Sequence, residues 1–409
     1  MDKPYERKIY FGMAIDPIHV GTGGYTLGRV DNPTLRDFDG IPKIPGTSIE
    51  GTTRTYAALY FKQPQCADKE KHNKKPQDGG CKYKNYKCKI CVTFGYTNSE
   101  GAKEDNKPES LQGMALFSDA KILFFPVASL IGPIWVTCPS RLKELNVDQG
   151  AWQDFDESRF CVVSNYLKSK LEDTGFLNFG WLLLQLKKKE NGETTTHNIC
   201  VDTLFGADGL KFRDRLLNDK EVEILEEILN RLVIVSNSVF SQIVDSNLEV
   251  RTSVSINPTT GAAEEGALFT YEAIPRTTIF YFDVVYQKPE HFGLNLGLND
   301  IVSTVETGFK LFEFLGVGGM GTRGFGKFKV FGLDEKYDKV KLSEIQANNL
   351  VGEIRKLKEE LKEIKADEER NIINVRIKEL QEKIRQTTEE MQKIAANWEK
   401  VCREVQGDD

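Results

Sequence analysis

The sequence lacks the excess of positive charge that a freely acting nucleic-acid binder usually carries. It has 55 lysines and arginines against 61 aspartates and glutamates, a formal net charge of −6 over 409 residues. It also lacks a long apolar run, since the stretch 121–136 is too short and contains prolines. The N-terminal residues have no apolar core of a signal peptide. We therefore expect a cytoplasmic protein that does not enter membranes.

The C-terminal part of the chain lacks proline. From Ser343 to Val405 there is none, and Gly352 is the one glycine. Apolar residues recur there at spacings of three and four, for example at Ile354, Leu357 and Leu361, among many charged residues. This spacing predicts an amphipathic helical hairpin or coiled coil over residues 340–409. Such a segment packs either on its own domain or on a partner, and both interpretations stay open.

The remainder has ordinary globular composition, with 40% hydrophobic and 28% charged residues. Apolar and β-branched runs predict strands within 7–20, 114–138, 177–202 and 267–286. Helices are expected over 46–61, with Thr47 or Ser48 as N-cap, and within 219–244. Strands and helices in this mixture indicate an α+β domain. We place this domain at 1–335, with an insertion at 62–110 and the helical segment at 340–409.

The insertion at 62–110 has few apolar residues and cannot build its own core. It contains Cys66, Cys81, Cys88 and Cys91, and the last two form a CxxC pair whose spacing lets two thiolates reach one tetrahedral zinc ion. Zinc would supply the folding energy that the insertion lacks. His72 is an alternative ligand. A redox CxxC pair and unliganded thiols are the competing interpretations.

Two further segments suggest contact with phosphate. Between Cys66 and Cys91 there are eight lysines against three acids, so the local charge is 8 − 3 = +5. This is explained either by phosphate contact or by a solvated loop around the metal. Residues 316–330, "GVGGMGTRGFGKFKV", place Arg323 and Lys327 among six glycines. Glycines let backbone N–H groups approach a phosphate closely, although a packed glycine-rich turn is the alternative.

Several motifs together resemble the RAMP superfamily of CRISPR-associated proteins. They are "HVGTGG", "LGRVDNPTLRD", "IPKIPGTSIEGTTR", "RTSVSINPTTGAAEEGALFTYEAIPRTTIFY" and the late "GVGGMGTRGFG". Within that superfamily they are nearest to the backbone subunit of type III effector complexes of the Cmr (III-B) kind. The CxxC pair followed by "VTFG" is also similar to the zinc-bearing Csm and III-D backbone subunits.

The resemblance implies a modified RRM-like (ferredoxin-like) core with a thumb β-hairpin. It implies a subunit that binds CRISPR RNA beside other type III subunits and cleaves bound target RNA at regular intervals. The acid of the family's "VD" motif, which is needed for cutting, corresponds to Asp31. His19, Tyr271 and Glu272 match positions near the cut site. A divalent metal such as Mg²⁺ would serve the cleavage, because the acid either holds such an ion or accepts a proton.

We expect RNA to contact residues in or beside glycine-rich and small-residue stretches. These residues are Arg54, Lys43, Gly318, Gly319, Gly321, Arg323, Lys327 and Arg251. Two other functions remain open at this point. One is a scaffold that binds guide RNA without cutting, and the other is a free-standing RAMP endoribonuclease that processes CRISPR transcripts. Structural roles are the alternatives for the acid and its neighbours: a turn cap for Asp31, a satisfied histidine for His19 and strand-end packing for the pair at 271 and 272.

Overall fold

The structure is a computed structural model that describes residues 3–23, 30–68, 81, 88–96, 110–145, 159–162, 165–171, 175–186, 217–333, 375–382 and 385–386. The chain forms two compact units, one of residues 1–213 with 221–333 and the other of 214–220 with 334–409. The predicted hairpin or coiled coil at 340–409 lies mostly outside the described residues. Its described parts, 375–382 and 385–386, are helical.

The first unit is built on a split β-α-β core. Its elements in chain order are β1 (Tyr5–Ala14), α1 (Gly46–Tyr60), β4 (Ala120–Ser129), β12 (Ile279–Gln287), α8 (Leu298–Lys310) and β13 (Phe328–Val330). The sheet order is β13-β1-β12-β4, and each neighbouring pair is antiparallel. This order and direction are those of the ferredoxin-like β-α-β-β-α-β motif. The predicted α+β, RRM-like core is therefore confirmed.

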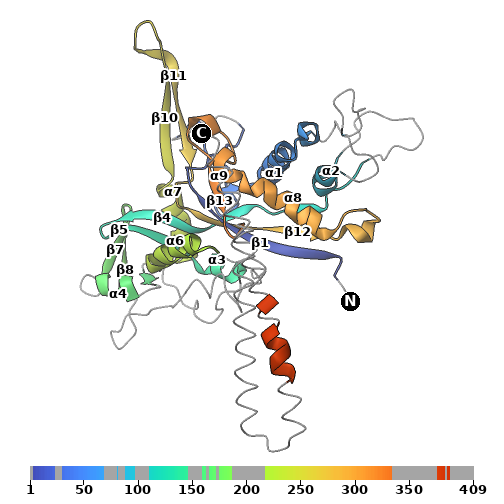
Figure 1. Cartoon of the computed structure of the whole chain (residues 1–409). Coiled ribbons are helices and arrows are strands. Elements are labelled where there is room, and N and C mark those ends of the chain that lie inside the picture. Colours follow the sequence, from blue (N-terminus) through green and yellow to red (C-terminus); the bar gives the residue numbers. More distant parts are fainter. Residues whose placement is uncertain are drawn as a thin grey trace, which may run out of the picture. The chain divides into compact units, whose positions relative to one another are not determined.

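The sheet continues beyond β4 through β5 (Gly132–Thr137), β9 (Leu232–Ile234), β6 (Arg159–Val162), β8 (Leu182–Leu186) and β7 (Phe176–Phe179). Short strand β2 (Lys43–Ile44) pairs with β4, and short strand β3 (Ala115–Phe117) pairs with β12. The other helices are α2 (Lys89–Phe94), α3 (Pro139–Glu144), α4 (Asn165–Leu171), α6 (Asp219–Asn230), α7 (Asn237–Ser246) and α9 (Phe312–Leu315). Figure 1 labels most of these elements. None of the helices described is long and apolar enough to cross a bilayer.

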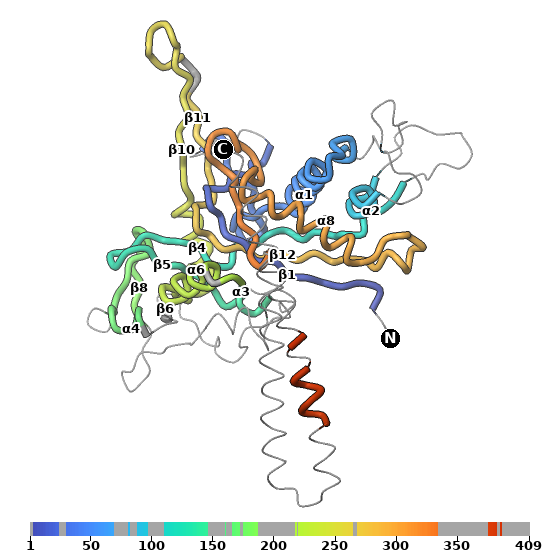
Figure 2. Tube along the Cα trace, in the orientation of Figure 1, coloured from blue at the N-terminus to red at the C-terminus, as the bar shows by residue number. Residues whose placement is uncertain are grey.

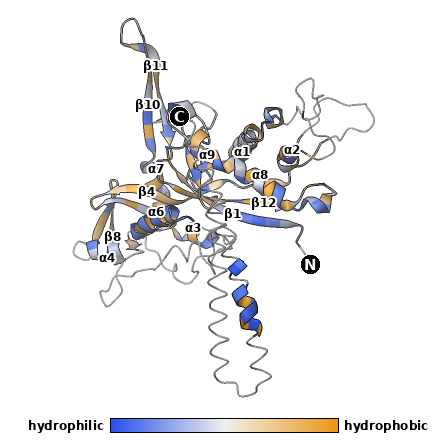
Figure 3. Ribbon diagram, in the orientation of Figure 1, coloured by the Kyte–Doolittle hydropathy of each residue, from blue (hydrophilic) through white to orange (hydrophobic). Residues whose placement is uncertain are grey.

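The strands β10 (Glu249–Ile256) and β11 (Ala263–Ala273) form a separate antiparallel hairpin. Figure 2 shows this hairpin extending away from the central sheet, to which β11 is joined through β12. Its outer strand β10 is half-exposed or exposed along its whole length, whereas β12 is largely buried. Figure 3 shows a similar contrast in hydropathy between the hairpin and the central sheet. Hydrophobic colours dominate β4 of the sheet, whereas the hairpin carries hydrophilic patches. A free-standing hairpin offers both faces to a ligand.

Helix α1 (Gly46–Tyr60) has about the predicted length but a different start. It begins at Gly46, whose N–H donates to Asp119 Oδ1 at 2.8 Å, so neither Thr47 nor Ser48 caps it. The core-facing residues are Ile49, Thr53 and Ala57 among others, whereas Leu59 and Tyr60 at its end are 50% and 62% exposed.

Helices α1 and α8 approach each other closely because Gly308 has no side chain. A Cβ atom at Gly308 would lie 2.6 Å from both the backbone oxygen and Cγ2 of Thr53. The aromatic core of the domain packs beside this crossing, where the Phe309 ring meets Tyr10 and Phe282 of the sheet at centroid distances of 5.1 and 5.4 Å. The crossing fixes the position of α1. Helix α1 in turn fixes where the insertion at 62–110, which carries the four cysteines, begins.

We expect Gly308→Ala to lower the free energy of unfolding by about 1–3 kcal/mol, because the helices must separate to admit a methyl group. Gly51→Ala is the matched control, since a Cβ at Gly51 in α1 meets nothing within 4 Å. That control should leave stability unchanged or raise it by up to about 1 kcal/mol through helix propensity. Denaturant unfolding of both variants measures the difference. Equal stability of the two would show that the close crossing does not limit packing.

Candidate functional site

The segment that contains Asp31 lies along strand β11 as an added strand. Asn32 N–H donates to the Thr270 carbonyl and Glu272 N–H donates to the Asn32 carbonyl, both at 3.0 Å. These bonds form a parallel bridge between Asn32 and Tyr271. They connect residues about 240 positions apart in the chain, so the base of the β10–β11 hairpin positions the predicted cutting acid.

The Asp31 carboxylate is held at one oxygen. Its Oδ2 accepts from Thr270 N–H at 2.8 Å and from Thr270 Oγ1 at 2.9 Å. Asp31 N–H in turn donates to the same hydroxyl at 2.9 Å. Within the chain that the structure describes, no hydrogen bond reaches Oδ1. The half-buried carboxylate therefore keeps one oxygen for a ligand, a metal ion or a proton.

His19 stands beside the next residues of β11. Its Nδ1 lies 2.6 Å from the Glu272 carbonyl oxygen, and its ring packs edge-on against Tyr271 at a centroid distance of 5.6 Å. Because a carbonyl oxygen only accepts, Nδ1 carries the hydrogen. This fixes the neutral tautomer with its lone pair on Nε2. His19 is 6% exposed, so its position is set by packing as well.

The glycine-rich segment closes this cluster. Gly319 N–H donates to the His19 carbonyl at 2.9 Å, and a Cβ at Gly318 would lie 2.6 Å from the same oxygen. Gly318 also has φ +88, which favours glycine. Arg323 Nη1 donates to the Tyr271 hydroxyl at 3.2 Å, and its guanidinium lies 6.0 Å from the Phe269 ring centre. The structure thus gathers Asp31, His19, Tyr271 and Arg323 from segments far apart in the chain.

Three other predicted cations differ in their surroundings. Arg251, on β10, lies over the Phe325 ring at 4.7 Å and pairs with Glu249. Lys327 is half exposed and 3.8 Å from Asp16. Lys43 pairs with Asp119 at 2.7 Å and with Asp37 at 3.5 Å. The hydrogen bond that Lys43 donates to Asp119 raises the pKa of Lys43 most, so the charge of Lys43 is already matched within the fold. Gly321 begins the short 3-10 turn that carries Arg323.

Glu272 holds the Asp31 segment at its far end. The carboxylate is 7% exposed. Its Oε2 accepts from Thr34 N–H at 3.0 Å and Thr34 Oγ1 at 2.9 Å, while Oε1 accepts from Arg36 Nη2 at 2.7 Å. Both oxygens are engaged, which suits a group that orients its neighbours. Thr34, Arg36 and Thr270 were missing from the predicted site; their one signal in the sequence is proximity to Asp31 or to Tyr271.

Arg54 requires a correction. Sequence reasoning placed it against RNA phosphate, but it is 1% exposed. Its guanidinium donates to the carbonyls of Cys66 at 2.8 Å and Gly95 at 2.7 Å. Burial lowers the pKa of Arg54, and nearby cysteines and Glu50 counter that effect. Arg54 therefore anchors the metal-binding segment to α1 and has no surface for RNA.

The four cysteines of the insertion come together as predicted. Cys66, Cys81, Cys88 and Cys91 are all buried, and their Sγ atoms lie within 4.8 Å of one another. Cys66 Sγ and Cys88 Sγ are 3.7 Å apart. Tetrahedral zinc with bonds of about 2.3 Å to sulfur requires sulfur atoms ~3.8 Å apart, so the donor set fits such an ion. His72 lies outside the described residues.

Hydrogen bonds within this cluster shift the pKa values of the thiols in opposite directions. The bond from Cys66 lowers the pKa of Cys88 most, whereas bonds with the other cysteines raise the pKa values of Cys66 and Cys91. Four buried sulfur donors that share hydrogen bonds, one of them on a thiol of lowered pKa, form a donor set that suits a metal cation. The cluster is thus positioned to hold a metal ion, and Arg54 lies in the surrounding shell.

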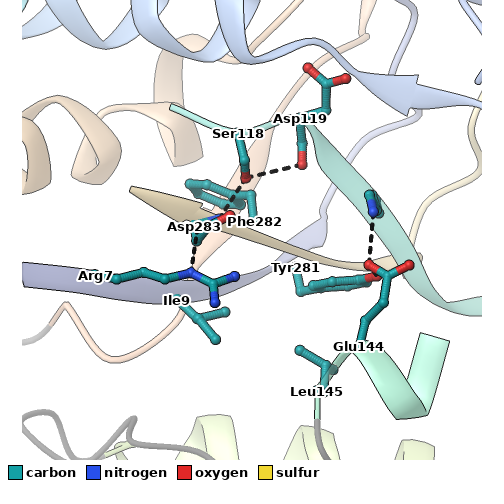
Figure 4. Close-up of a pocket in the computed structure, with 10 residues that line it drawn as sticks. Arg7, Ile9, Ser118, Asp119, Glu144, Leu145, Tyr281, Phe282 and Asp283 are labelled. Atoms are coloured by element: carbon teal, nitrogen blue, oxygen red, sulfur yellow. Dashed lines mark hydrogen bonds and ion pairs between the residues drawn. The ribbon is translucent and has the colours of Figure 1, made fainter. Parts of the chain in front are cut away.

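A separate pocket of about 220 Å³ lies between β1, β12, the start of β4 and the end of α3 (Figure 4). Its charges are paired: Arg7 with Asp283 at 2.6 Å, and Glu144 with Lys121 at 2.8 Å. Figure 4 shows both pairs at the pocket wall. None of the predicted site residues lines this pocket, so it does not belong to the cluster around Asp31.

Comparison with known proteins identifies the family of the chain. The model of the RAMP superfamily matches residues 13–329, so the chain belongs to that superfamily.

Among individual proteins, the chain is similar to the CRISPR system Cmr endoribonuclease Cmr4 of Pyrococcus furiosus. The two are 28% identical over 282 residues, which are 65% of this chain and 77% of that protein. A shorter match, 36% over 89 residues, covers 21% of this chain and 33% of the CRISPR system Cms endoribonuclease Csm3 of Methanocaldococcus jannaschii. A chain of the type III-B Cmr-beta complex bound to cognate target RNA shares the fold, with a TM-score of 0.50, 16% identity, and coverage of 81% of this chain and 99% of that one.

Proposed function

We propose that this protein binds guide RNA within a type III CRISPR effector complex and cleaves the bound target RNA, with Asp31 as the cutting acid. The observation that carries the proposal is the Asp31 carboxylate, fixed on Thr270 through Oδ2 and open at Oδ1, on the same stretch of β11 whose next residue, Tyr271, contacts His19 and Arg323. Similarity to endoribonucleases of the Cmr and Csm systems supports the same activity. The partners are then guide RNA, target RNA and other subunits, and the expected location is the cytoplasm.

The chemistry follows from the parts. RNA is cut when its 2′-hydroxyl attacks the adjacent phosphate in line, which requires that the nucleotide be turned into that geometry. The 2′-oxygen loses its proton and bonds to phosphorus to give a 2′,3′-cyclic phosphate, while the bond from phosphorus to the 5′-oxygen breaks and that oxygen takes a proton from water. The free-standing β10–β11 hairpin is the element suited to this task, as the thumb. Asp31 Oδ1 would hold a Mg²⁺ ion or take the hydroxyl proton. His19 Nε2 is a second proton acceptor, and Arg323 offsets charge on the phosphorane.

Glu272 has a supporting role in this proposal. Glu272, bound to Thr34 and Arg36, orients the segment that carries Asp31 and is not itself a proton carrier. Guide contacts come from Arg323, Lys327 and Arg251 with the glycine-rich backbone, since Arg54 is buried and Lys43 is paired. A structural zinc ion on the four cysteines stabilises the insertion.

Asp31→Asn tests the catalytic assignment, because it keeps the acceptor for Thr270 and removes the charge. We expect the single-turnover cleavage rate of a complementary RNA to fall by at least about a hundred-fold, with guide binding and assembly unchanged. Glu290→Ala, at an exposed acid outside the site, is the control. A chelator should reproduce the loss if Oδ1 holds a metal ion. Undiminished cutting by Asp31→Asn would leave the scaffold function in its place.

Arg323→Ala with Lys327→Ala tests the guide contacts. The slope of log affinity against log salt should become shallower by about 0.7 for each phosphate that the variant no longer neutralises. Affinity should fall equally for guides of unrelated sequence, because backbone contacts carry no sequence information. Arg276→Ala with Lys143→Ala, at two exposed cations outside the site, is the charge-matched control. A decrease that varies with guide sequence would indicate base recognition instead.

Elemental analysis tests the metal. The purified protein should hold about one zinc ion per chain, and Cys88→Ser with Cys91→Ser should remove it. Cys138→Ser is the control, because Cys138 is also buried but lies outside the cluster. It should keep the full zinc content. Zinc retained by the double variant would exclude this cluster as the site.

A further inference from the structure

Thr270 is the residue that touches the Asp31 carboxylate. Its N–H and its hydroxyl both donate to Oδ2, at 2.8 and 2.9 Å, and the hydroxyl accepts from Asp31 N–H. The hydroxyl therefore acts as donor and acceptor in one closed ring of bonds with Asp31. In the described chain no other group donates to this carboxylate. Thr270 is half-buried on β11, at the base of the β10–β11 hairpin.

Two donors on one oxygen fix the plane of a carboxylate as well as its position. With Oδ2 held on the β11 side, Oδ1 is directed away from β11. Charge-assisted hydrogen bonds of this kind are stronger than neutral ones. The nearby Arg36 does not replace them, because its guanidinium donates to Glu272 instead. Without the Thr270 hydroxyl the segment would stay attached to β11, but the carboxylate would keep only the Thr270 N–H as donor and would be held less firmly.

We infer that Thr270 is a positioning residue for RNA cleavage, which aims Asp31 Oδ1 at the scissile nucleotide. The inference rests on the proposed function and adds a residue to it. Thr270 also couples the position of the hairpin to RNA cleavage, because Thr270 belongs to strand β11 of the hairpin. A hairpin displaced from its position between guide and target would carry the cutting acid with it. Cleavage then depends on correct seating of the hairpin as well as on Asp31.

Thr270→Val is the decisive change, because it keeps the shape and the backbone donor and removes only the hydroxyl. We expect single-turnover cleavage to slow by about ten- to a hundred-fold, the effect of one hydrogen bond to a charged group. Guide affinity, target affinity and the positions of the cuts should not change. Thr270→Ser restores a hydroxyl and should recover most of the rate. Thr307→Val, the same change on α8, should have no effect on cleavage.

The outcomes separate this inference from the proposed function. If wild type cuts, Asp31→Asn does not, and Thr270→Val cuts at the wild-type rate, the inference is wrong and the proposed function stands. If Asp31→Asn cuts normally, the proposed acid is wrong whatever Thr270→Val does. A slow Thr270→Val that also loses target affinity and is not rescued by serine would show a structural role in the hairpin. Slow cutting with unchanged affinity and recovery by serine supports the inference.

Discussion

The pairing of residues 31–36 with strand β11 is the interaction on which the site depends. Backbone bonds attach Asn32 to the strand, Thr270 holds Asp31, and Glu272 holds Thr34 and Arg36. An isolated acidic loop would be repelled by RNA phosphates. Here three neighbouring residues of one strand fix the loop in place, so no contribution from the RNA is needed to order it. The acid is thus preorganised, as the proposed role in cleavage requires.

The metal-binding segment is attached to the same core by a different buried group. Arg54 extends from α1 to the carbonyls of Cys66 and Gly95, on either side of the cysteine cluster. Helix α1 is itself fixed by its close crossing with α8 at Gly308. Few residues of this insertion are apolar, so the buried guanidinium at its edge supports its folding. A metal ion on the four cysteines would be a second support.

Local patterns predicted α1 and several strands but not the core helix α8 or the strands β10 and β13. Long-range contacts explain what the local patterns missed in the site. Apolar runs indicated α1 and the predicted strands, and the spacing of Cys88 and Cys91 indicated a metal-binding pair, because those features depend on nearby residues. Arg54 was assigned to RNA because it lies in a stretch of small residues, and Glu272 was assigned to the cut site because the family resemblance implied it. Only the fold reveals that both are buried. Thr270 attracted no notice, since threonine is common in strands and its partner lies 239 positions away. The topology and the role of Asp31 came from the resemblance to RAMP proteins.

The central claim is that the fold itself directs Asp31 Oδ1 at the phosphate that is cut. A structure of the assembled complex with a target RNA carrying a 2′-deoxy nucleotide at the cut site tests it most directly, because that RNA binds but cannot react. We predict the scissile phosphate beside Asp31, in direct or metal-bridged contact with Oδ1, while Oδ2 stays on Thr270. A scissile phosphate placed against another subunit, with Asp31 remote from any backbone atom of the RNA, would contradict the account.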